Sequence, residues 1–225
     1  MKPQLAIIVP MLNEAGTLPE LLAHLQRFHD RGMEIVLVDG GSDDATRDIA
    51  SQSPFTVITS TRGRALQMNT GAQASDAGVL LFLHADTRLP DTADIAIGRA
   101  LAAGRQWGRF NVKIEARHPV LKIVAMMMNL RSRLSGIVTG DQALFMTREV
   151  FNKVGGFPRQ PLMEDIEISK RLKGLGLPAC LWDQVTTSGR RWQKFGVWRT
   201  IWLMWQLRFD YWRGVPASKL AGRYQ

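Results

Sequence analysis

The stretch that decides the fold is Phe82-Leu83-His84-Ala85-Asp86-Thr87, an apolar run that ends abruptly in a carboxylate. This pattern is typical of a buried parallel strand that delivers an acid to the edge of a sheet. Ligands of open α/β sheets bind beyond the carboxyl ends of the strands. Asp39 ends a second apolar run in the same way, and Glu164-Asp165 follows a loop further along. Acids brought to one rim are suited to hold a nucleotide, a divalent cation and a substrate hydroxyl.

Strand and helix patterns alternate around this run over residues 1–104. We expect strands at Leu5–Pro10, Glu34–Asp39, Phe55–Thr59 and Val79–His84, and helices at Thr17–Phe28, Asp44–Gln52, Ala65–Ala74 and Thr92–Ala102. This alternation predicts an α/β fold with a mostly parallel central sheet flanked by helices on both faces.

The regular alternation stops after Gly104. We expect further strands at Arg109–Glu115 and Ala143–Met146, and helices at Val120–Leu134, Glu164–Leu175 and Val197–Trp212. The length of 225 residues fits one domain with a sizeable core. We divide it into a nucleotide-binding half (1–104), an acceptor and catalytic half (105–195) and a C-terminal helical extension with a basic tail (196–225).

The composition is that of a soluble globular protein, with 45% hydrophobic and 22% charged residues. The one cysteine, Cys180, excludes an internal disulfide, and we expect it to be a small buried core residue. The chain opens into a strand-like run without a charged leader, and no apolar run approaches the ~18 residues of a membrane span. We therefore expect a cytoplasmic protein. The net charge of +9, concentrated near the C-terminus, suits an anionic partner or a solvated surface.

The end of the first strand and the end of the second together favour a nucleotide pocket. Pro10 stops the first strand, and Asn13 and Glu14 follow it at the rim. Asp39 is placed to accept a hydrogen bond from a base N–H or a ribose hydroxyl, and Gly41 allows a sharp turn and a close ligand. Helix capping by Asn13 and Glu14 is the alternative, as is a turn aspartate at Asp39.

Two arginines, Arg62 and Arg64, flank Gly63 where a helix is expected to begin. Their side chains and the N-terminal amides are suited to converge on phosphate. A basic helix cap on the surface is the alternative.

Asp86, at the end of the fourth strand, is suited to bind Mg²⁺ or Mn²⁺ that bridges two phosphates. His84 is a weaker candidate for a second ligand, which would favour Mn²⁺, and a buried histidine bonded to the backbone is the alternative.

Three further segments are candidates for catalysis or for binding the second substrate. Glu164-Asp165 stands at a helix start, the right place for a general base, with a capping acid pair as the alternative. Gly140-Asp141 lies in a polar loop that we expect to contact acceptor or donor sugar. Arg190-Arg191-Trp192 puts two guanidinium groups beside an indole, suited to a leaving diphosphate and a sugar platform.

Taken in order, these segments resemble the glycosyltransferase family 2 pattern on the GT-A fold, and the resemblance covers nearly the whole chain. It implies an inverting transferase that uses a nucleotide-diphosphate sugar, such as a UDP-sugar, and Mn²⁺ or Mg²⁺. By position, Asp39 would hold the base, Asp86 the metal, and Asp165 would act as base toward the acceptor. Arg190-Arg191-Trp192 resembles a shortened form of the Arg-Trp motif of processive members.

One departure from the family pattern is His84, because the family's metal motif usually begins with an acid at this position. Asp86 is then the expected direct ligand. Within the family, the segment from Gly63 to Ala72 resembles a short bacterial branch associated with radical-SAM and selenodomain proteins and with arsenosugar biosynthesis. That resemblance implies a small-molecule acceptor.

The last expected helix carries an aromatic stripe of Trp198, Trp202, Trp205, Phe209 and Trp212. Core or dimer packing is the default, and an interfacial helix on an anionic membrane is the alternative, as would suit a lipid-linked acceptor. Two rival functions are a sugar-phosphate nucleotidylyltransferase and a non-catalytic nucleotide or membrane-binding module. Nucleic-acid binding ranks last, because the aromatic residues do not interleave with the basic ones.

Overall fold

The structure, a computed structural model, describes residues 4–116 and 118–224 apart from the side chain of Arg191. The strands are β1 (Leu5–Met11), β2 (Glu34–Asp39), β3 (Thr56–Thr59), β4 (Val79–Phe82), β5 (Thr87–Arg88), β6 (Trp107–Glu115), β7 (Leu144–Thr147) and β8 (Ala179–Ser188). The helices are α1 (Leu18–His29), α2 (Thr46–Ser51), α3 (Arg64–Gln73), α4 (Ala93–Ala102), α5 (Val120–Ser135), α6 (Arg148–Lys153), α7 (Glu164–Lys173), α8 (Arg190–Phe195), α9 (Val197–Trp212) and α10 (Ala217–Tyr224), with a 3-10 turn η1 (Gly140–Gln142). The strands form one mixed sheet in the order β3-β2-β1-β4-β7-β6-β8-β5.

The first half of the sheet is parallel. β1 lies between β2 and β4, and β3 continues the sheet beside β2. The register pairs Met11 with Asp39 and Asp39 with Thr59, so these strands end level at one edge. The apolar runs of β1 and β2 are buried along most of their length because helices cover the sheet on both sides.

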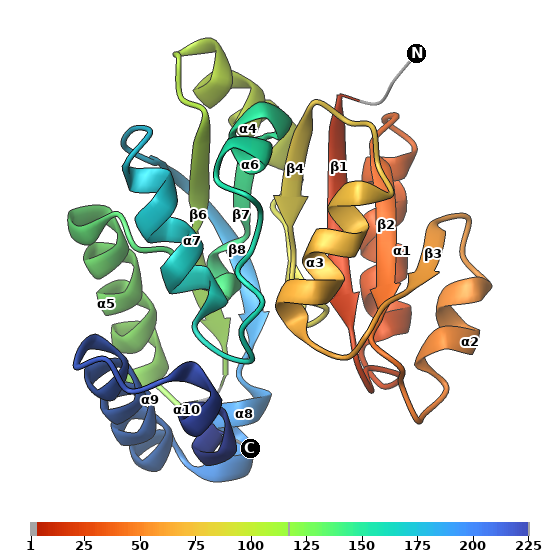
Figure 1. The fold of residues 1–225 in the computed structure, drawn as a ribbon. Coiled ribbons are helices and arrows are strands. Elements are labelled where there is room, and N and C mark those ends of the chain that lie inside the picture. The colour runs from red at the N-terminus through yellow and green to blue at the C-terminus, as the bar shows by residue number, and fades with distance from the viewer. Residues whose placement is uncertain (1–3, 117, 225) are drawn as a thin grey trace.

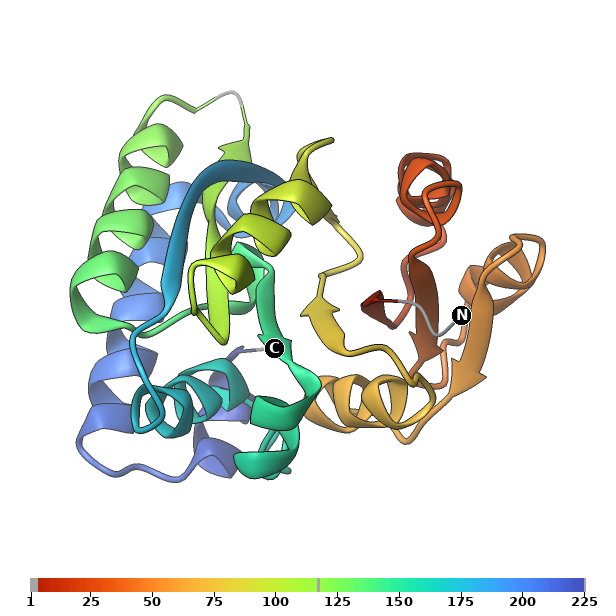
Figure 2. The same ribbon diagram turned by 90° about the horizontal axis from the view of Figure 1, so that it is seen from above.

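Two hydrophobic clusters lie on opposite faces of this sheet. Figures 1 and 2 show the helices that cover the two faces. α1, α2 and α4 pack on one face, where α1 buries Leu18, Leu21, Leu25 and Phe28 in an amphipathic stripe. α3, α6 and α7 pack on the other face, where Met68 and Ile168 meet the alternate side chains of β1 and β4. The expected covering of both faces is therefore present.

The second half turns the sheet from parallel to mixed. β7 pairs antiparallel with both β4 and β6, and β8 runs parallel to β6. β5 closes the far edge as an antiparallel partner of β8. β5, β8, α6, α8 and α10 were not among the expected elements, whereas β2 and α9 have the bounds expected from the sequence.

The C-terminal extension is an outer layer that shields one end of α7. Leu207 of α9 and Leu220 of α10 are buried against Leu162 and Met163, which precede α7. The aromatic stripe of α9 points the other way, and its five side chains are 54–80% exposed. Of the default expectation, core or dimer packing, the core part is therefore wrong, because Leu203, Leu207 and Tyr211 form the inward face.

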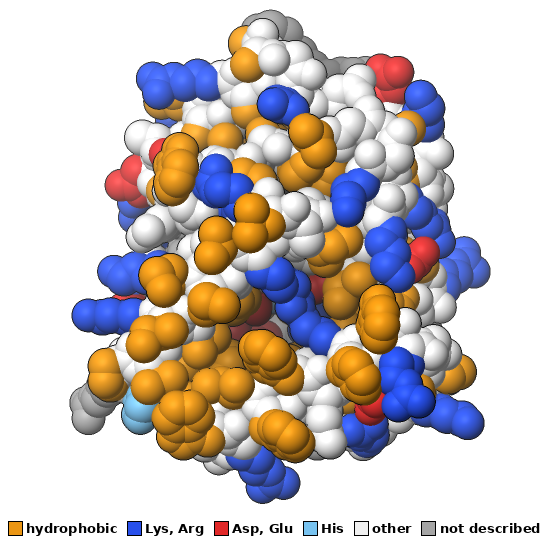
Figure 3. Space-filling model, turned by 90° about the vertical axis from the view of Figure 1, so that its left-hand side faces the viewer, with side chains coloured by type: hydrophobic (Ala, Val, Ile, Leu, Met, Phe, Trp, Pro, Cys, Tyr) orange, Lys and Arg blue, Asp and Glu red, His pale blue; other side chains and the backbone are white. Residues whose placement is uncertain are grey.

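Exposed hydrophobic side chains also line α5, next to α9 in the fold (Figure 1). Figure 3 shows the face that carries these helices: hydrophobic side chains surround a hollow in which acidic and basic side chains are visible. Within the described part of the chain, no helix combines the length and the apolar composition needed to cross a bilayer. Cys180 lies on β8 and is half-buried, so the expectation of a fully buried core cysteine is wrong.

Candidate active site

The loops after β1 and β2 are tied together at the level edge of the sheet. The Asn13 backbone N–H donates to Ser42 Oγ at 3.0 Å, and the Asp43 N–H donates to Asn13 Oδ1 at 2.8 Å. Buried Gln67 of α3 donates from Nε2 to the carbonyls of Met11 and Val38, at 2.7 and 2.9 Å. Asn13 thus joins two loops and does not cap α1, so the capping alternative does not describe its side chain.

Asp39 ends β2 with its side chain 2% exposed. Its carboxylate accepts hydrogen bonds from the N–H of Gly41 and Ser42 and from Ser42 Oγ, the last at 2.6 Å. These are the contacts of a turn aspartate, the alternative stated above. They also hold the carboxylate at the rim, beside the positive-φ turn at Gly41.

Arg62 belongs to the same rim and does not point toward the centre of the site. Its Nη2 donates to the Gly41 carbonyl and to Asp43 Oδ2, each at 2.9 Å. The side chain is 56% exposed, so this ion pair is worth at most ~1 kcal/mol. Arg62 therefore clasps the loop after β2 and has ample freedom to turn toward a ligand.

Arg190, at the start of α8, connects the second half to the acids of the first. Its Nη2 donates to Glu14 Oε2 at 2.8 Å and lies 3.9 Å from Asp86 Oδ2. The Ser188 N–H donates to the Asp86 carbonyl at 3.0 Å, which holds the end of β8 against the loop after β4. Trp192 packs with Ile114, Leu121 and Ala125, so its indole supports α5. The side chain of Arg191 lies outside the described residues.

Asp86 sits among charges of both signs. Burial raises the pKa of its carboxyl group above the ordinary value; His84 and Arg190 act against this, whereas Asp141 and Glu14 add to it. Burial disfavours the ionised form of this carboxyl group, and a bound cation would stabilise that form. Across the described ranges, no three His, Cys, Asp or Glu side chains cluster closely enough to complete a metal site from protein groups alone.

His84 packs against the 3-10 turn η1. Its Nδ1 lies 3.3 Å from Asp141 Oδ1, and its Nε2 is buried without a hydrogen-bond partner. A Cβ placed on Gly140 would lie 2.2 Å from Nε2, so the backbone of Gly140 covers that nitrogen. Burial works to raise the pKa of Asp141, but His84, Arg64 and Arg208 outweigh it and hold the pKa below its usual value. His84 positions the turn, and Asp86 is the better candidate for a metal ligand.

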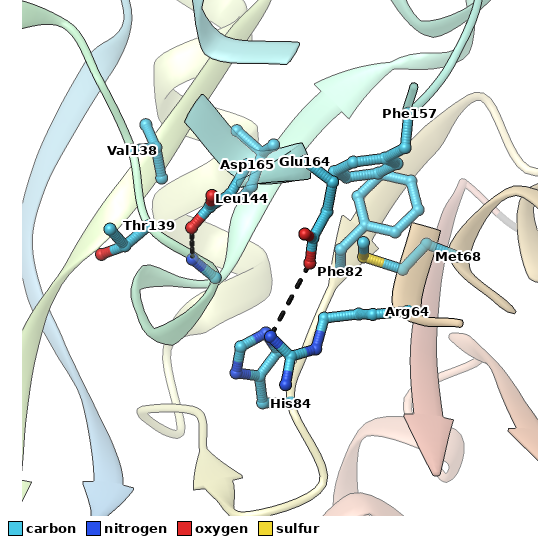
Figure 4. A pocket seen from close by; sticks show the side chains of 11 residues that line it. Arg64, Met68, Phe82, His84, Val138, Thr139, Leu144, Phe157, Glu164 and Asp165 are labelled. Atoms are coloured by element: carbon cyan, nitrogen blue, oxygen red, sulfur yellow. Dashed lines mark hydrogen bonds and ion pairs between the residues drawn. The ribbon is translucent and has the colours of Figure 1, made fainter. Parts of the chain in front are cut away.

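Glu164 and Asp165 begin α7 with their carboxylates in different environments (Figure 4). Asp165 Oδ2 accepts the Gly140 N–H at 3.0 Å, and Oδ1 accepts the Ile166 N–H at 2.8 Å. Glu164 is buried, and its Oε1 lies 3.7 Å from Arg64 Nη1. Burial raises the pKa of Glu164, Asp165 raises it further, and Arg64 acts in the opposite direction.

A small pocket brings part of the expected constellation together (Figure 4). It is lined by Arg64, His84, Gly140, Glu164 and Asp165 among apolar side chains such as Phe82 and Phe157. Asp39 and Asp86 do not line it. Asp39 ends β2 and Asp86 follows β4 at the same edge of the sheet, and Arg190 lies 3.9 Å from Asp86. The candidate site is thus an open rim with an enclosed end at Asp165.

Two arginines near Asp165 were not among the residues expected at the site. Arg131 of α5 and Arg208 of α9 both lie near enough to Asp165 for its charge to raise their pKa against the lowering effect of burial. Arg208 belongs to a helix that also carries Arg199 and the aromatic stripe, a pattern that suggests a surface position for its arginines. Neither position carries a local motif, and the signal that finds them is the packing of α5 and α9.

The sequence model of "Glycosyl transferase family 2" matches residues 6–149, more than half of the chain, and the chain belongs to this family. A "PGL/p-HBAD biosynthesis glycosyltransferase" of Mycobacterium bovis is 35% identical over 106 residues, 42% of this chain and 40% of the relative. An "Undecaprenyl-phosphate 4-deoxy-4-formamido-L-arabinose transferase" of Pseudomonas syringae is 33% identical over 105 residues, 40% of this chain and 31% of the relative. The matched part thus spans well under half the length of these relatives.

Solved structures share the fold. The chain resembles residues 1–349 of S. aureus TarS in complex with UDP, with a TM-score of 0.68 at 19% identity over 84% of this chain and 60% of that one. It also resembles glucosyl-3-phosphoglycerate synthase from Mycobacterium tuberculosis in complex with Mn²⁺, UDP and glucosyl-3-phosphoglycerate, with a TM-score of 0.60 at 19% identity over 83% of this chain and 70% of that one. The expected α/β fold of the GT-A type is therefore confirmed.

Proposed function

We propose that this chain is an inverting glycosyltransferase that moves a sugar from a nucleotide-diphosphate donor, a UDP-sugar, to an acceptor hydroxyl. The observation that carries the proposal is the contact of Arg190 with Glu14 and Asp86 beyond the carboxyl ends of β1 and β4. Ligands of open α/β sheets bind at such an edge. Family membership and the UDP in the TarS complex support the donor class.

The donor nucleotide would lie along the rim made by the loops after β1 and β2. Pro10, Asn13 and Glu14 shape one side, and Asp39 and Gly41 shape the other. Asp39 would exchange its bond from Ser42 Oγ for one from the base or the ribose, since an ionised carboxylate accepts several hydrogen bonds. Arg62 and Arg64 stand at the start of α3, where cationic side chains favour phosphate.

Asp86 would hold the divalent cation, Mn²⁺ or Mg²⁺, together with oxygens of the diphosphate. Hard cations in such sites commonly use one or two carboxylates and complete their coordination with phosphate and water. When bound, the cation neutralises charge that develops on the leaving diphosphate. Arg190 is placed to add a charge-assisted hydrogen bond to the same group once it leaves Glu14. Arg191, next in the sequence, is a second candidate for the diphosphate, whereas Trp192 packs against Ile114 and Leu121 and is not placed as a sugar platform.

Asp165 is the general base in this proposal. The acceptor oxygen attacks the anomeric carbon from the face opposite the diphosphate, and its proton passes to a carboxylate oxygen of Asp165. The bond between the anomeric carbon and the diphosphate oxygen breaks, and its electron pair stays with the diphosphate. The N–H groups of Gly140 and Ile166 fix the carboxylate, while Glu164 holds Arg64 beside it. Asp141 would contact the sugar from the neighbouring turn.

The exposed face of α5 and α9 supports a proposal for the class of acceptor. Five aromatic side chains of α9 are exposed there, beside Met126, Met127 and Leu130 of α5. Contiguous apolar patches mark interaction sites, and the net charge of +9 favours an anionic surface. We propose a lipid-linked acceptor, reached by a cytoplasmic chain that lies on an anionic membrane through this face. The relative whose name contains undecaprenyl phosphate supports this class over the small-molecule acceptor that the branch resemblance implies.

Liposome flotation tests the membrane part. Vesicles of 70:30 phosphatidylcholine and phosphatidylglycerol should carry the protein upward, and pure phosphatidylcholine vesicles should carry less. The double variant Trp202→Ser and Trp205→Ser should stay at the bottom. A wild-type dimer in solution whose formation the same variant abolishes, without flotation, would assign the face to a second copy of the chain.

Donor screening tests the transferase itself. The protein is incubated with UDP- and GDP-sugars, Mn²⁺ and a lipid extract, and products are detected by mass. We expect one donor to give a glycosylated lipid, and NMR of its anomeric proton to show inversion. Release of the free nucleoside diphosphate without any sugar transfer, or addition of a nucleotide to a sugar phosphate, would contradict the proposal. The second outcome would favour the nucleotidylyltransferase.

A further inference from the structure

Two half-buried arginines from separate helices lie close enough to Asp165 to feel its charge, although neither lines the small pocket itself. Arg131 is near the end of α5 and Arg208 is near the end of α9. Burial first, and then the charges of Arg208 and Arg109, lower the pKa of Arg131 to about 10, against the opposing charge of Asp165. Burial likewise lowers the pKa of Arg208, against the charges of Asp165 and Asp141. Both side chains are half-buried, and the charge of Arg208 is one of those that act on Arg131.

The guanidinium of Arg131 has N–H groups without a hydrogen-bond acceptor among the described residues. Its Nε and Nη2 are buried, and neither donates a hydrogen bond to any described residue. Arg109, which also lies under α5, shows the contrast: its Nε, Nη1 and Nη2 donate to Ser132, Asn111 and Asn129 respectively. Buried N–H groups without acceptors cost free energy, and a guanidinium fork matches a phosphate or carboxylate. Arg131 is thus built to receive an anion that the protein itself does not supply.

The carboxylates nearby do not fill this role. Among the described residues, none approaches within 4.0 Å of a nitrogen of Arg131 or Arg208, whereas Arg64 has Glu164 at 3.7 Å. Asp165 directs both oxygens to backbone N–H groups of Gly140 and Ile166. Arg190, the candidate for the donor diphosphate, has its own partners in Glu14 and Asp86, neither of which lines the pocket with Asp165. The anion expected at Arg131 is therefore a different group from the diphosphate.

The two helices that carry these arginines also carry the exposed apolar face. Met127 and Leu130 of α5 and Trp205 and Phe209 of α9 are about half exposed or more. On this side of the molecule, hydrophobic side chains surround the hollow that contains charged groups (Figure 3). A ligand that meets both surfaces needs an anionic head and an apolar chain.

We propose that Arg131 and Arg208 form an acceptor subsite that binds a phosphate group of an amphiphilic acceptor, whose apolar chain lies on the face of α5 and α9. The subsite rests on the proposed transferase function and specifies its acceptor. The phosphate anchors the acceptor, and a neighbouring hydroxyl is then presented to Asp165. Arg131 and Arg208 are positioning residues, and the phosphate is not the nucleophile.

Isothermal titration with farnesyl phosphate, inorganic phosphate and farnesol tests the subsite without a reaction. We expect wild-type protein to bind farnesyl phosphate at least tenfold more tightly than either inorganic phosphate or farnesol. Arg131→Met and Arg208→Met should each weaken farnesyl phosphate binding about tenfold or more. Arg131→Lys should restore part of it, because the charge returns without the fork. Arg199→Met removes an exposed arginine of α9, the helix that carries Arg208, and should change the affinity for farnesyl phosphate less than twofold.

A UDP and Mn²⁺ titration of the same variants separates this proposal from the transferase. Unchanged UDP affinity in Arg131→Met and Arg208→Met supports an acceptor subsite. A tenfold loss of UDP affinity in both would assign the arginines to the donor diphosphate and overturn the proposal while the transferase stands. Equal effects of Arg199→Met and Arg131→Met on farnesyl phosphate would also overturn it, as would equal affinity for inorganic and farnesyl phosphate. A wild-type protein that binds farnesyl phosphate but no nucleotide would refute the proposed function instead.

Folding of the variants is checked by thermal unfolding. Should Arg131→Met unfold, Arg208→Met decides, because Arg208 lies on the outer helix α9 and its removal leaves the sheet and α5 intact.

Discussion

Arg190 donates a hydrogen bond from Nη2 to Glu14 Oε2 at 2.8 Å, although 176 positions separate the two residues in the chain. The contact closes the rim between the loop after β1 and the start of α8. Both side chains are partly exposed, at 48% for Arg190 and 23% for Glu14. Breaking the ion pair therefore costs little free energy. The guanidinium of Arg190 is thus held in place by Glu14 and is easily released to bind a diphosphate.

Replacing Arg190 tests that role. Arg190→Ala should lower kcat by about 10²-fold, the usual effect of removing one donor from a developing anion. The free energy of unfolding should change by less than ~1 kcal/mol, because the lost ion pair is exposed to solvent. Steady-state transfer assays and urea unfolding measure the two quantities. Arg199→Ala, which removes an exposed arginine of α9, is the control and should leave turnover intact. A loss of stability that accounts for the lost activity would show that Arg190 is structural.

Asp165→Asn removes the proposed base and keeps the shape of the side chain. We expect sugar transfer to fall by ~10²–10⁴-fold, the range for a positioned base, while UDP binding stays within twofold. Glu167→Gln removes another carboxylate from the first turn of α7 and controls for the interaction with the helix dipole. Near-normal transfer by Asp165→Asn would refute the assignment.

Glu164 links pH to stability. Its pKa is raised in the folded protein, by burial first and then by Asp165, so the folded state holds this proton more tightly than the unfolded state. The free energy of unfolding should therefore decrease as pH rises from the unfolded pKa through the raised folded pKa. Glu164→Gln should remove that decrease, so its stability relative to wild type should grow between pH 4 and pH 7. Urea titrations at several pH values measure this, with the exposed Glu149→Gln as control. A difference that shrinks with rising pH would mean that the pair with Arg64 dominates.

Gly140 is a position where one methyl group should matter. A Cβ there would lie 2.2 Å from His84 Nε2 and 2.4 Å from Cε1, so the imidazole must move. The turn also supplies the N–H that fixes Asp165. Gly140→Ala should therefore lower kcat by about 10²-fold, since small misplacements near reacting groups cost that much. Gly98→Ala lies in α4 with no atom within 4 Å of the new Cβ and should keep full activity. Equal activity of the two variants would show that the turn tolerates the shift.

The first half of the fold was predictable because each of its strands and helices has a clear pattern of apolar residues within its own short segment of sequence. The apolar run of β2 stops at Asp39, and the structure ends the strand at the same residue. β8 was not predictable in this way, since its pairing with β6 and β5 uses residues that are far apart in the chain. α10 similarly depends on the packing of Leu220 against α9.

The residues of the candidate site also fall into two groups, those with a local sequence signal and those brought together only by packing. Asp39 and Asp86 follow strand ends, where the sheet edge makes acids informative, and Glu164 and Asp165 start a recognisable helix. Arg131 and Arg208 lie within helical patterns that carry no local motif, and their approach to Asp165 comes from the way α5 and α9 pack. The aromatic stripe of α9 misled because the larger side chains suggested the buried face, whereas Leu207 marks it.

The most direct test of the account is a UDP titration with and without Mn²⁺, on wild type and on Asp86→Asn. We predict that Mn²⁺ strengthens UDP binding to wild type at least tenfold, and more so as pH rises, because Asp86 with its raised pKa must lose its proton to hold the cation. Asp86→Asn should bind UDP weakly with no response to Mn²⁺, while Asp91→Asn, an exposed acid a few residues later, should behave as wild type. Wild-type protein that binds neither UDP nor GDP, with or without the metal, would contradict the account.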